Sequence, residues 1–188
     1  MDRVVPPASR MQIRDMELRF FTQLHELTHQ IQRGSDNPLG KLQEIYALAD
    51  LVGELTTPGT ACSKGCSRCC RVDLPITTIE ARYIRKHVGI VPRTGSSISS
   101  GHTVARRPCP FLDAAGACSI YPFRPFVCRT LHAPGQPACN DIATPHARYG
   151  SRNNYILEKL FHLLDVINKR KPIRDIRDFF PLTTDPFP

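Results

Sequence analysis

Apolar residues recur at helical spacing over the N-terminal part of the chain. They repeat every three or four positions from Met11 to about Arg33, and Gly34 then provides a stop signal. After a polar S-D-N-P turn, a second stretch has the same period and ends near Pro58. Two periodic stretches joined by a short turn predict an antiparallel helical hairpin over residues 11–57. The apolar stripe of its first helix consists of Ile13, Met16, Phe20, Leu24, Leu27 and Ile31.

The central part of the chain is much less periodic. Residues 75–89 predict one helix there, because Thr77 and Glu80 have the spacing of a capping box. Further on, the sequence C-P-F-L-D-A-A-G-A-C-S-I-Y predicts a short β-hairpin around its A-G pair, and a short helix is expected to open at Pro122. Strong helical spacing returns only over residues 152–170.

Composition indicates that the irregular segments need support other than packing. The chain has 188 residues, of which 41% are hydrophobic, with 17 prolines and no tryptophan. We expect one unit of mainly α (α+β) class: a small, irregular, cysteine-rich core organised by metal, with a short β-hairpin and flanking helices. The predicted organisation is a flexible arm over residues 1–10, the helical hairpin over 11–57, a cysteine-cluster metal-binding domain over 58–150, a C-terminal helix packed on it over 151–171, and an extended tail over 172–188.

Eight cysteines are the main chemical signal. Four of them fall in the sequence C-S-K-G-C-S-R-C-C, in which a C-x2-C pair can turn two sulfurs towards one point. Lys64, Arg68 and Arg71 lie among these thiols, and positive neighbours favour the metal-binding thiolate. Soft thiolates select zinc, copper(I) or iron–sulfur clusters. The candidate metal ligands are Cys62, Cys66, Cys69, Cys70, Cys109, Cys118, Cys128 and Cys139.

The adjacent cysteines Cys69 and Cys70 are awkward for a single tetrahedral ion, because neighbouring side chains tend to diverge. They fit better if the two sulfurs bind different metals, or if one of them is not a ligand. The number of metal centres and the division of the cysteines between them therefore stay open.

Structural disulfides and buried free cysteines are the alternatives to metal binding. The N-terminal residues lack the apolar run of a secretory signal, and no stretch reaches the roughly 18 apolar residues of a membrane span. We therefore expect a soluble, cytoplasmic protein without a membrane partner. Cytosolic thiols are kept reduced, which favours metal over disulfides.

The formal net charge of +8 raises the question of a polyanionic partner. Thiolates bound to divalent metal would lower this charge, and would halve it if all eight cysteines held two ions. The charge pattern is more typical of a solvated basic surface than of a nucleic-acid-binding protein. An unidentified protein partner stays open.

The sequence H-E-L-T-H spells H-E-x-x-H, in which His25 and His29 could bind zinc from one helix face and Glu26 could act as a general base. The context argues against a zinc peptidase. Only 24 residues precede the motif. On a helical wheel, both histidines lie more than roughly 100° from the centre of the apolar stripe. We expect a polar, solvent-facing surface here.

Other polar residues near the cysteines are weaker candidates. His102, His132 and His146 could each replace a cysteine as a ligand, although the pattern favours a position at the surface or behind the ligands. Arg124 and Arg129 could donate hydrogen bonds to thiolate or sulfide sulfur and so tune a cluster, and structural bonds to loop carbonyls are the alternative. The chain has no Gly-rich phosphate loop, no Ser-His-Asp order and no paired-carboxylate signature.

Three blocks of the sequence together resemble a known family. C-S-K-G-C-S-R-C-C, then the order C-x-I-Y-x-x-R-P-x-x-C-R, then A-C-N-D-I-A-T-P-H-A-R-Y-G, is similar to the YkgJ-type cysteine-cluster proteins. These proteins carry a CxxCxxCC signature and are described as zinc- or iron-chelating domains. The resemblance covers about residues 60–150 and implies a zinc or iron site without a settled reaction. The first gap has three residues here and commonly two in the family, so Cys62 is the least secure ligand.

Two hypotheses follow from the resemblance and the cysteines. The first is a metal-binding protein in which zinc or iron supports the fold and a contact surface. The second is an iron–sulfur enzyme or enzyme component, because the flagellin lysine N-methylase is similar in its cysteine motif. A radical S-adenosylmethionine enzyme would need a long α/β barrel, and only 118 residues without βα repeats follow Cys70. Whether the protein is an enzyme stays open, and the zinc peptidase is the most remote alternative.

Overall fold

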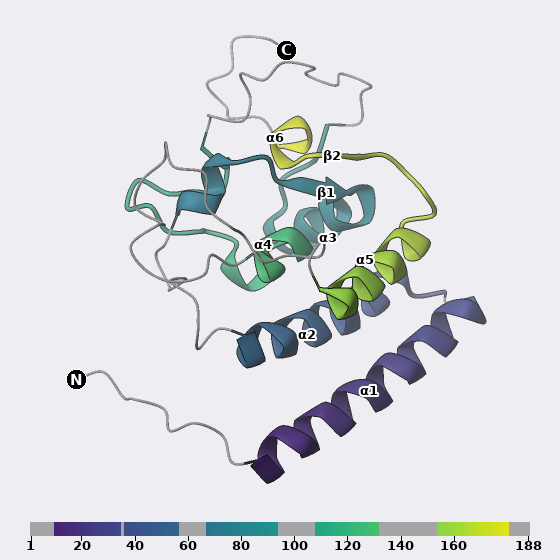
Figure 1. The fold of residues 1–188 in the computed structure, drawn as a ribbon. Coiled ribbons are helices and arrows are strands. Elements are labelled where there is room, and N and C mark those ends of the chain that lie inside the picture. Colours follow the sequence, from purple (N-terminus) through teal and green to yellow (C-terminus); the bar gives the residue numbers. More distant parts are fainter. Residues whose placement is uncertain (1–9, 35, 57–66, 94–107, 132–153, 181–188) are drawn as a thin grey trace.

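The computed structural model describes residues 10–34, 36–56, 67–93, 108–131 and 154–180. This part of the chain is mainly helical with one small antiparallel sheet, which confirms the predicted fold class. The N-terminal helices α1 (Arg10–Gln32) and α2 (Pro38–Thr56) run antiparallel to each other, as the periodicity predicts (Figure 1). No helix in the described residues combines the length and the apolar character that crossing a membrane requires.

One hydrophobic core holds the helical part of the molecule together. α5 (Tyr155–Ile167) packs on α2 and also contacts α1. Leu27 of α1, Ile45 of α2 and Leu160 of α5 are almost completely buried where the three helices meet. The stripe of α1 faces this core, because a helix in a globular protein turns its apolar side inward. Its buried members are Phe20, Leu24, Leu27 and Ile31.

α3 (Thr78–Val88) begins and ends where its sequence signals predict. Thr77 is the N-cap, and its side chain forms a capping box with Glu80. Gly89 closes the helix in the left-handed conformation, with φ of 76°, and its N–H donates to the carbonyl oxygen of Arg85 at 2.8 Å. These signals lie within a few residues of one another, so the sequence alone defines this helix.

A second hydrophobic core lies on the other side of α3. Ile79 and Tyr83 of α3 belong to the first core, whereas Ala81 and Ile84 belong to the second. The cysteine-rich part of the chain therefore has apolar packing of its own, which the sequence did not indicate. The other members of the second core are Leu74, Ile76, Cys109, Phe111, Ile120, Ile176, Phe179 and Phe180.

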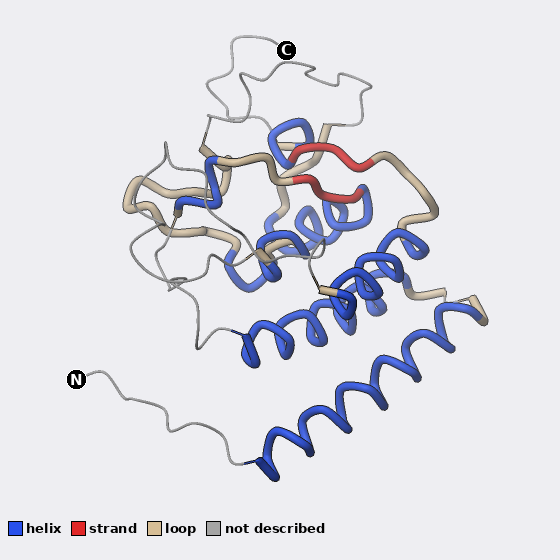
Figure 2. The backbone as a smooth tube through the Cα atoms, viewed as in Figure 1, coloured by secondary structure: helices blue, strands red, loops and turns tan. Residues whose placement is uncertain are grey.

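The two-stranded sheet joins segments that are distant in the sequence. β1 (Pro75–Thr77) pairs antiparallel with β2 (Ile173–Asp175), and Figure 2 shows the two strands in red, side by side. β2 leads directly into α6 (Ile176–Phe179), whose Phe179 is buried. The prediction of an extended tail from residue 172 was wrong for this segment. The elements are too short to give a periodic signal, and they form only because a distant strand and core receive them.

The cysteine loop between these elements folds back on itself. Leu112 and Cys118 form an isolated antiparallel bridge, and Ser119 N–H donates to the carbonyl oxygen of Phe111 at 2.8 Å. The carboxylate of Asp113 accepts hydrogen bonds within the turn, and Gly116 supplies the positive φ of 78° that the turn requires. The predicted hairpin is therefore present with a single bridge. The 3-10 helix η4 (Tyr121–Phe123) and α4 (Phe126–Thr130) follow it.

Glu80 connects three helices from a completely buried position. Its carboxylate accepts hydrogen bonds from Tyr46 Oη of α2 at 3.1 Å, from Phe126 N–H of α4 at 2.7 Å, and from the N–H and Oγ1 of Thr77 at 2.7 and 2.9 Å. Burial raises the pKa of this carboxyl, and the hydrogen bonds oppose that rise. The side chain thus fixes the start of α4, which carries Cys128, relative to α2 and α3.

The variant Glu80→Gln should be destabilised by roughly 2–6 kcal/mol. An amide nitrogen cannot accept hydrogen bonds, so about two of the four donors would remain buried without a partner, at roughly 1–3 kcal/mol each. Urea denaturation measures the loss. The matched control is Glu54→Gln, an exposed glutamate on α2, which should change stability by less than about 0.5 kcal/mol. Equal stability of the two variants would show that the carboxylate network does not hold these helices.

Candidate metal centre

Three separate segments carry the described cysteines. Cys69 and Cys70 lie in the 3-10 helix η2 (Arg68–Arg71), Cys109 and Cys118 in the folded loop, and Cys128 in α4. No disulfide joins any of the described cysteines. The remaining predicted ligands and the three histidines among them lie outside the described residues. These are Cys62, Cys66, Cys139, His102, His132 and His146.

Four of the described thiols form one electrostatic group. Burial raises the pKa of Cys128 well above its ordinary value, and the thiols of Cys69, Cys109 and Cys118 raise it further. Burial also raises the pKa of Cys118, to which Cys69 again contributes. The pKa of Cys109 is raised to about 11, mainly by burial, with Cys118 adding to the effect. Cys109, Cys118 and Cys128 also lie in or against the second hydrophobic core, so the fold brings thiols of separate segments to one region.

The donor chemistry of this group fits zinc or iron. Four soft sulfur donors from three segments meet in apolar surroundings, and a bound cation would compensate the charge of thiolates that burial otherwise disfavours. Within the described residues, no three His, Cys, Asp or Glu side chains are already arranged as a complete ligand shell. The described thiols are therefore grouped, but they would have to converge further to hold an ion together.

The adjacent cysteines play different parts. Cys69 is among the strongest influences on Cys118 and Cys128, and Cys70 is not. The side chain of Cys70 packs against the second core, while its carbonyl oxygen accepts the N–H of Cys109 at 2.8 Å. Whether the two sulfurs bind different metals, or only one of them is a ligand, stays a prediction.

A C-terminal clamp, which we define as Asp175 and Arg177, holds the backbone around the cysteine turn. The guanidinium of Arg177, 6% exposed, donates to the carbonyl oxygens of Cys70 at 2.9 Å and Val72 at 3.2 Å. It also pairs with Asp175 at 2.9 Å, and the carboxylate of Asp175 accepts the N–H of Leu74 at 2.7 Å. Sequence reasoning missed this clamp, because about 105 residues separate the partners along the chain. The one local signal for a buried ion pair was the R-D-I-R-D-F-F sequence, in which charged residues alternate with large apolar ones.

Arg129 bonds to oxygen atoms in this structure. Its Nε donates to the carbonyl oxygen of Arg124 at 2.9 Å and its Nη2 to that of Pro122 at 2.8 Å, and its Nη1 pairs with Asp50 of α2. The guanidinium also lies 4.3 Å from the ring centroid of Tyr46. These are the structural bonds to loop carbonyls that the sequence left as the alternative to a role at sulfur.

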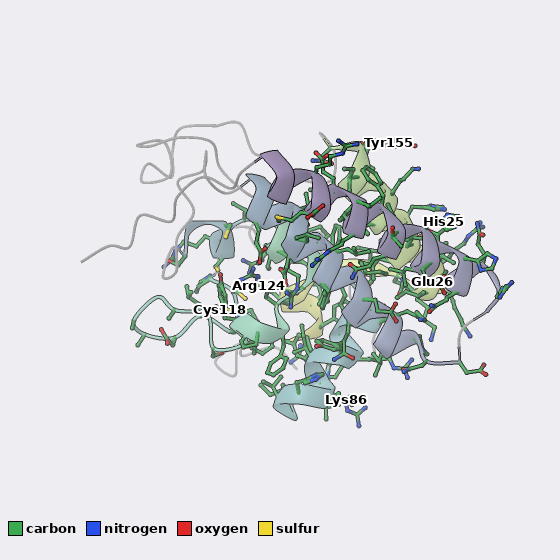
Figure 3. All side chains as sticks on the ribbon, turned by 90° about the horizontal axis from the view of Figure 1, so that it is seen from below. His25, Glu26, Lys86, Cys118, Arg124 and Tyr155 are labelled. Carbon is green, nitrogen blue, oxygen red and sulfur yellow. The ribbon has the colours of Figure 1, made fainter. Side chains whose placement is uncertain are left out.

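Arg124 has a direct influence on one of the thiols. Its charge lowers the pKa of Cys118, against the larger effect of burial, and Figure 3 shows the two residues close together. The guanidinium lies 4.0 Å from the ring centroid of Tyr121 and 3.5 Å from the carboxylate of Asp50. Its buried Nε has no hydrogen-bond partner in the described part of the chain. Arg124 is therefore placed to stabilise thiolate charge at Cys118.

The H-E-x-x-H residues lie away from the cysteines. His25, Glu26 and His29 are exposed on α1, and Figure 3 shows His25 and Glu26 far from Cys118. Glu26 accepts a hydrogen bond from Gln30 Nε2 at 2.7 Å, which lowers its pKa. The predicted solvent-facing surface is confirmed.

Replacing both His25 and His29 by alanine should leave the metal content and the melting temperature of the protein unchanged. Both side chains are exposed, and exposed substitutions away from special features change stability by less than about 0.5 kcal/mol. Elemental analysis and thermal denaturation of the variant test this. A loss of one metal equivalent would establish a zinc site on α1.

Comparison with known proteins supports a metal-binding site and indicates no catalytic reaction. The model of a family described as "CxxCxxCC: Putative zinc- or iron-chelating domain" matches residues 61–152. This range contains all eight cysteines of the chain. No curated protein and no solved structure matches the chain.

Proposed function

Because residues 61–152 belong to the CxxCxxCC family, we propose that the protein binds zinc or iron through cysteine thiolates. One centre takes its ligands from the grouped thiols Cys69, Cys109, Cys118 and Cys128. Cys62, Cys66 and Cys139, which the spacing also predicts as ligands, complete this centre or supply a second one.

The observation that carries this proposal is that cysteines from three segments lie in or against the second hydrophobic core, with Cys109 buried and Cys118 and Cys128 partly buried, and that their thiols interact electrostatically with one another and with Cys69. Buried cysteines at such density in a reducing compartment are typical of metal ligands. A bound ion would tie η2, the folded loop and α4 to one another. Metal–thiolate binding contributes roughly 10–16 kcal/mol in structural zinc sites, so binding and the ordering of these segments are expected to be coupled.

The proposal is tested by elemental analysis of protein purified without oxygen. At least one equivalent of zinc or iron per chain is expected. Acid-labile sulfide together with iron would favour the iron–sulfur alternative, and zinc without sulfide would favour a structural thiolate centre. Substoichiometric metal that cannot be restored by zinc or iron, or native disulfides among the cysteines, would overturn the proposal.

The same preparation allows a spectroscopic test. Cobalt(II) added to the metal-free protein should produce thiolate-to-cobalt charge-transfer absorption that saturates at a fixed stoichiometry, and zinc should displace it. The stoichiometry then gives the number of centres. Circular dichroism and limited proteolysis with and without metal measure how far binding orders the cysteine segments.

A further inference from the structure

The solvent face of α3 is basic. Arg82, Arg85 and Lys86 share this face, because residues three and four apart on a helix are neighbours. All three are exposed, and Figure 3 shows Lys86 at the edge of the molecule. Glu80, the only acidic residue of α3, is buried on the opposite side. The two cores occupy the rest of the helix surface, so this row of cations cannot turn inward.

Three more cations extend the row at the start of α3. The K-R-K sequence at residues 169–171 forms the turn between α5 and β2, and its side chains are exposed. Two hydrogen bonds join the residues on either side of this turn, Asn168 and Pro172, to the first turn of α3. Thr78 Oγ1 donates to the carbonyl oxygen of Pro172 at 3.1 Å, and Ile79 N–H donates to Asn168 Oδ1 at 3.2 Å. The six cations therefore lie on adjoining parts of the surface, which we call the basic face.

No acidic side chain neutralises the basic face within the described residues. The ion pairs of that part of the chain involve other cations. Asp165 and Asp175 are the acidic residues closest in sequence to the K-R-K turn. Neither forms an ion pair with the turn, and Asp175 pairs with Arg177 instead. The segments outside the described residues contain few acidic residues that could serve instead, namely Asp2, Asp141 and Asp185.

We propose that the basic face is a docking surface for an acidic segment of a protein partner. Six neighbouring cations that form no ion pair with any described residue are complementary to carboxylates, and such complementarity speeds association and selects the partner. Directly after α3, Ile90 and Val91 are 50% and 65% exposed. Their segment is held in place, because Arg93 N–H donates to the carbonyl oxygen of Phe179 at 2.8 Å. Protein interfaces combine apolar contacts with a charged rim, and an acidic segment with aliphatic residues can cover both features.

The observations favour a protein over the other polyanions. Single-stranded nucleic acids bind to exposed aromatic side chains interleaved with cations, and the aromatic residue of α3, Tyr83, is buried. Helices that bind anionic membranes bury their apolar face in the lipid, and the apolar face of α3 is already packed in the two cores.

The test measures binding of a fluorescein-labelled glutamate–leucine copolymer by fluorescence anisotropy. The variant R82Q/R85Q/K86Q should bind it about tenfold more weakly than the wild type, as expected for the loss of three exposed ion pairs. The matched control is R14Q/R19Q/R33Q, which removes the same charge from exposed positions in α1 and directly after it. It should change the affinity by less than about twofold, because those cations lie outside the basic face. The variant Ile90→Ser with Val91→Ser should weaken binding of the copolymer and leave binding of poly-L-glutamate unchanged.

Other outcomes would overturn the proposal. If both triple variants lost the same affinity for the copolymer, the binding would depend on net charge and not on the basic face. Tighter binding of double-stranded DNA or of phosphatidylserine vesicles than of the copolymer would assign the face to nucleic acid or membrane. Absence of binding to the copolymer would remove the docking surface altogether. The metal content of the protein does not enter any of these measurements, so they are independent of the proposed metal centre.

Discussion

The Cys128→Ser variant should bind zinc about 10² to 10³ times more weakly than the wild type. Burial raises the pKa of Cys128 well above its ordinary value, and three other thiols act on it. If four thiolates share the roughly 10–16 kcal/mol of a structural zinc site, each contributes about 2.5–4 kcal/mol, which corresponds to this loss. Serine has nearly the same shape, but its hydroxyl is a hard donor that does not ionise at neutral pH. Competition with a chromophoric chelator, carried out anaerobically, measures the affinity.

Cys70→Ser is the matched control, because Cys70 lies next to Cys69 but outside the electrostatic group. Serine retains the carbonyl oxygen that accepts from Arg177 and Cys109, and it has nearly the same shape where the side chain packs against the second core. The variant should keep its affinity within a few-fold of the wild type. If Cys70→Ser lost as much affinity as Cys128→Ser, the assignment of the centre to Cys69 rather than Cys70 would be wrong, and the two adjacent sulfurs would serve separate metals.

The Arg177→Met variant should lose about 3–5 kcal/mol of stability and about 10- to 100-fold in metal affinity. Methionine leaves the half-buried carboxylate of Asp175 and the carbonyl oxygens of Cys70 and Val72 without the guanidinium, and breaking one side of a buried ion pair has a cost of this size. The affinity falls because residues that orient metal ligands typically contribute this factor. Urea denaturation of the metal-free protein and metal competition measure the two effects separately.

Two further variants separate positioning from stability alone. Arg85→Met removes an exposed arginine with no such contacts and should change neither quantity. Arg177→Lys keeps the charge opposite Asp175 but cannot serve both carbonyl oxygens, so it should recover more stability than affinity. The contrary outcome is a cobalt spectrum of Arg177→Met at saturation identical to that of the wild type, with unchanged metal affinity. In that case the C-terminal clamp would stabilise the fold without positioning the metal ligands.

The sequence determined the helices, because their signals are local. The period of apolar residues in α1 and the capping box of α3 involve residues three or four apart, and these are neighbours on a helix whatever the rest of the chain does. The same periodicity placed His25 and His29 on the solvent side of α1. Sequence also predicts thiolate metal ligands, because four cysteines in nine residues are not explained by core packing.

Only the tertiary structure decided how the distant parts meet. β2 has three residues and no hydrophobic pattern of its own. It is a strand because it pairs with β1, which lies about a hundred positions earlier in the chain. Arg177 and Cys70 come together in the same way, through contacts that no local spacing records. Cys70 likewise packs against the second core, whose members come from distant parts of the chain. Local geometry follows from neighbouring residues, whereas the grouping of thiols from three segments requires the whole chain to be folded.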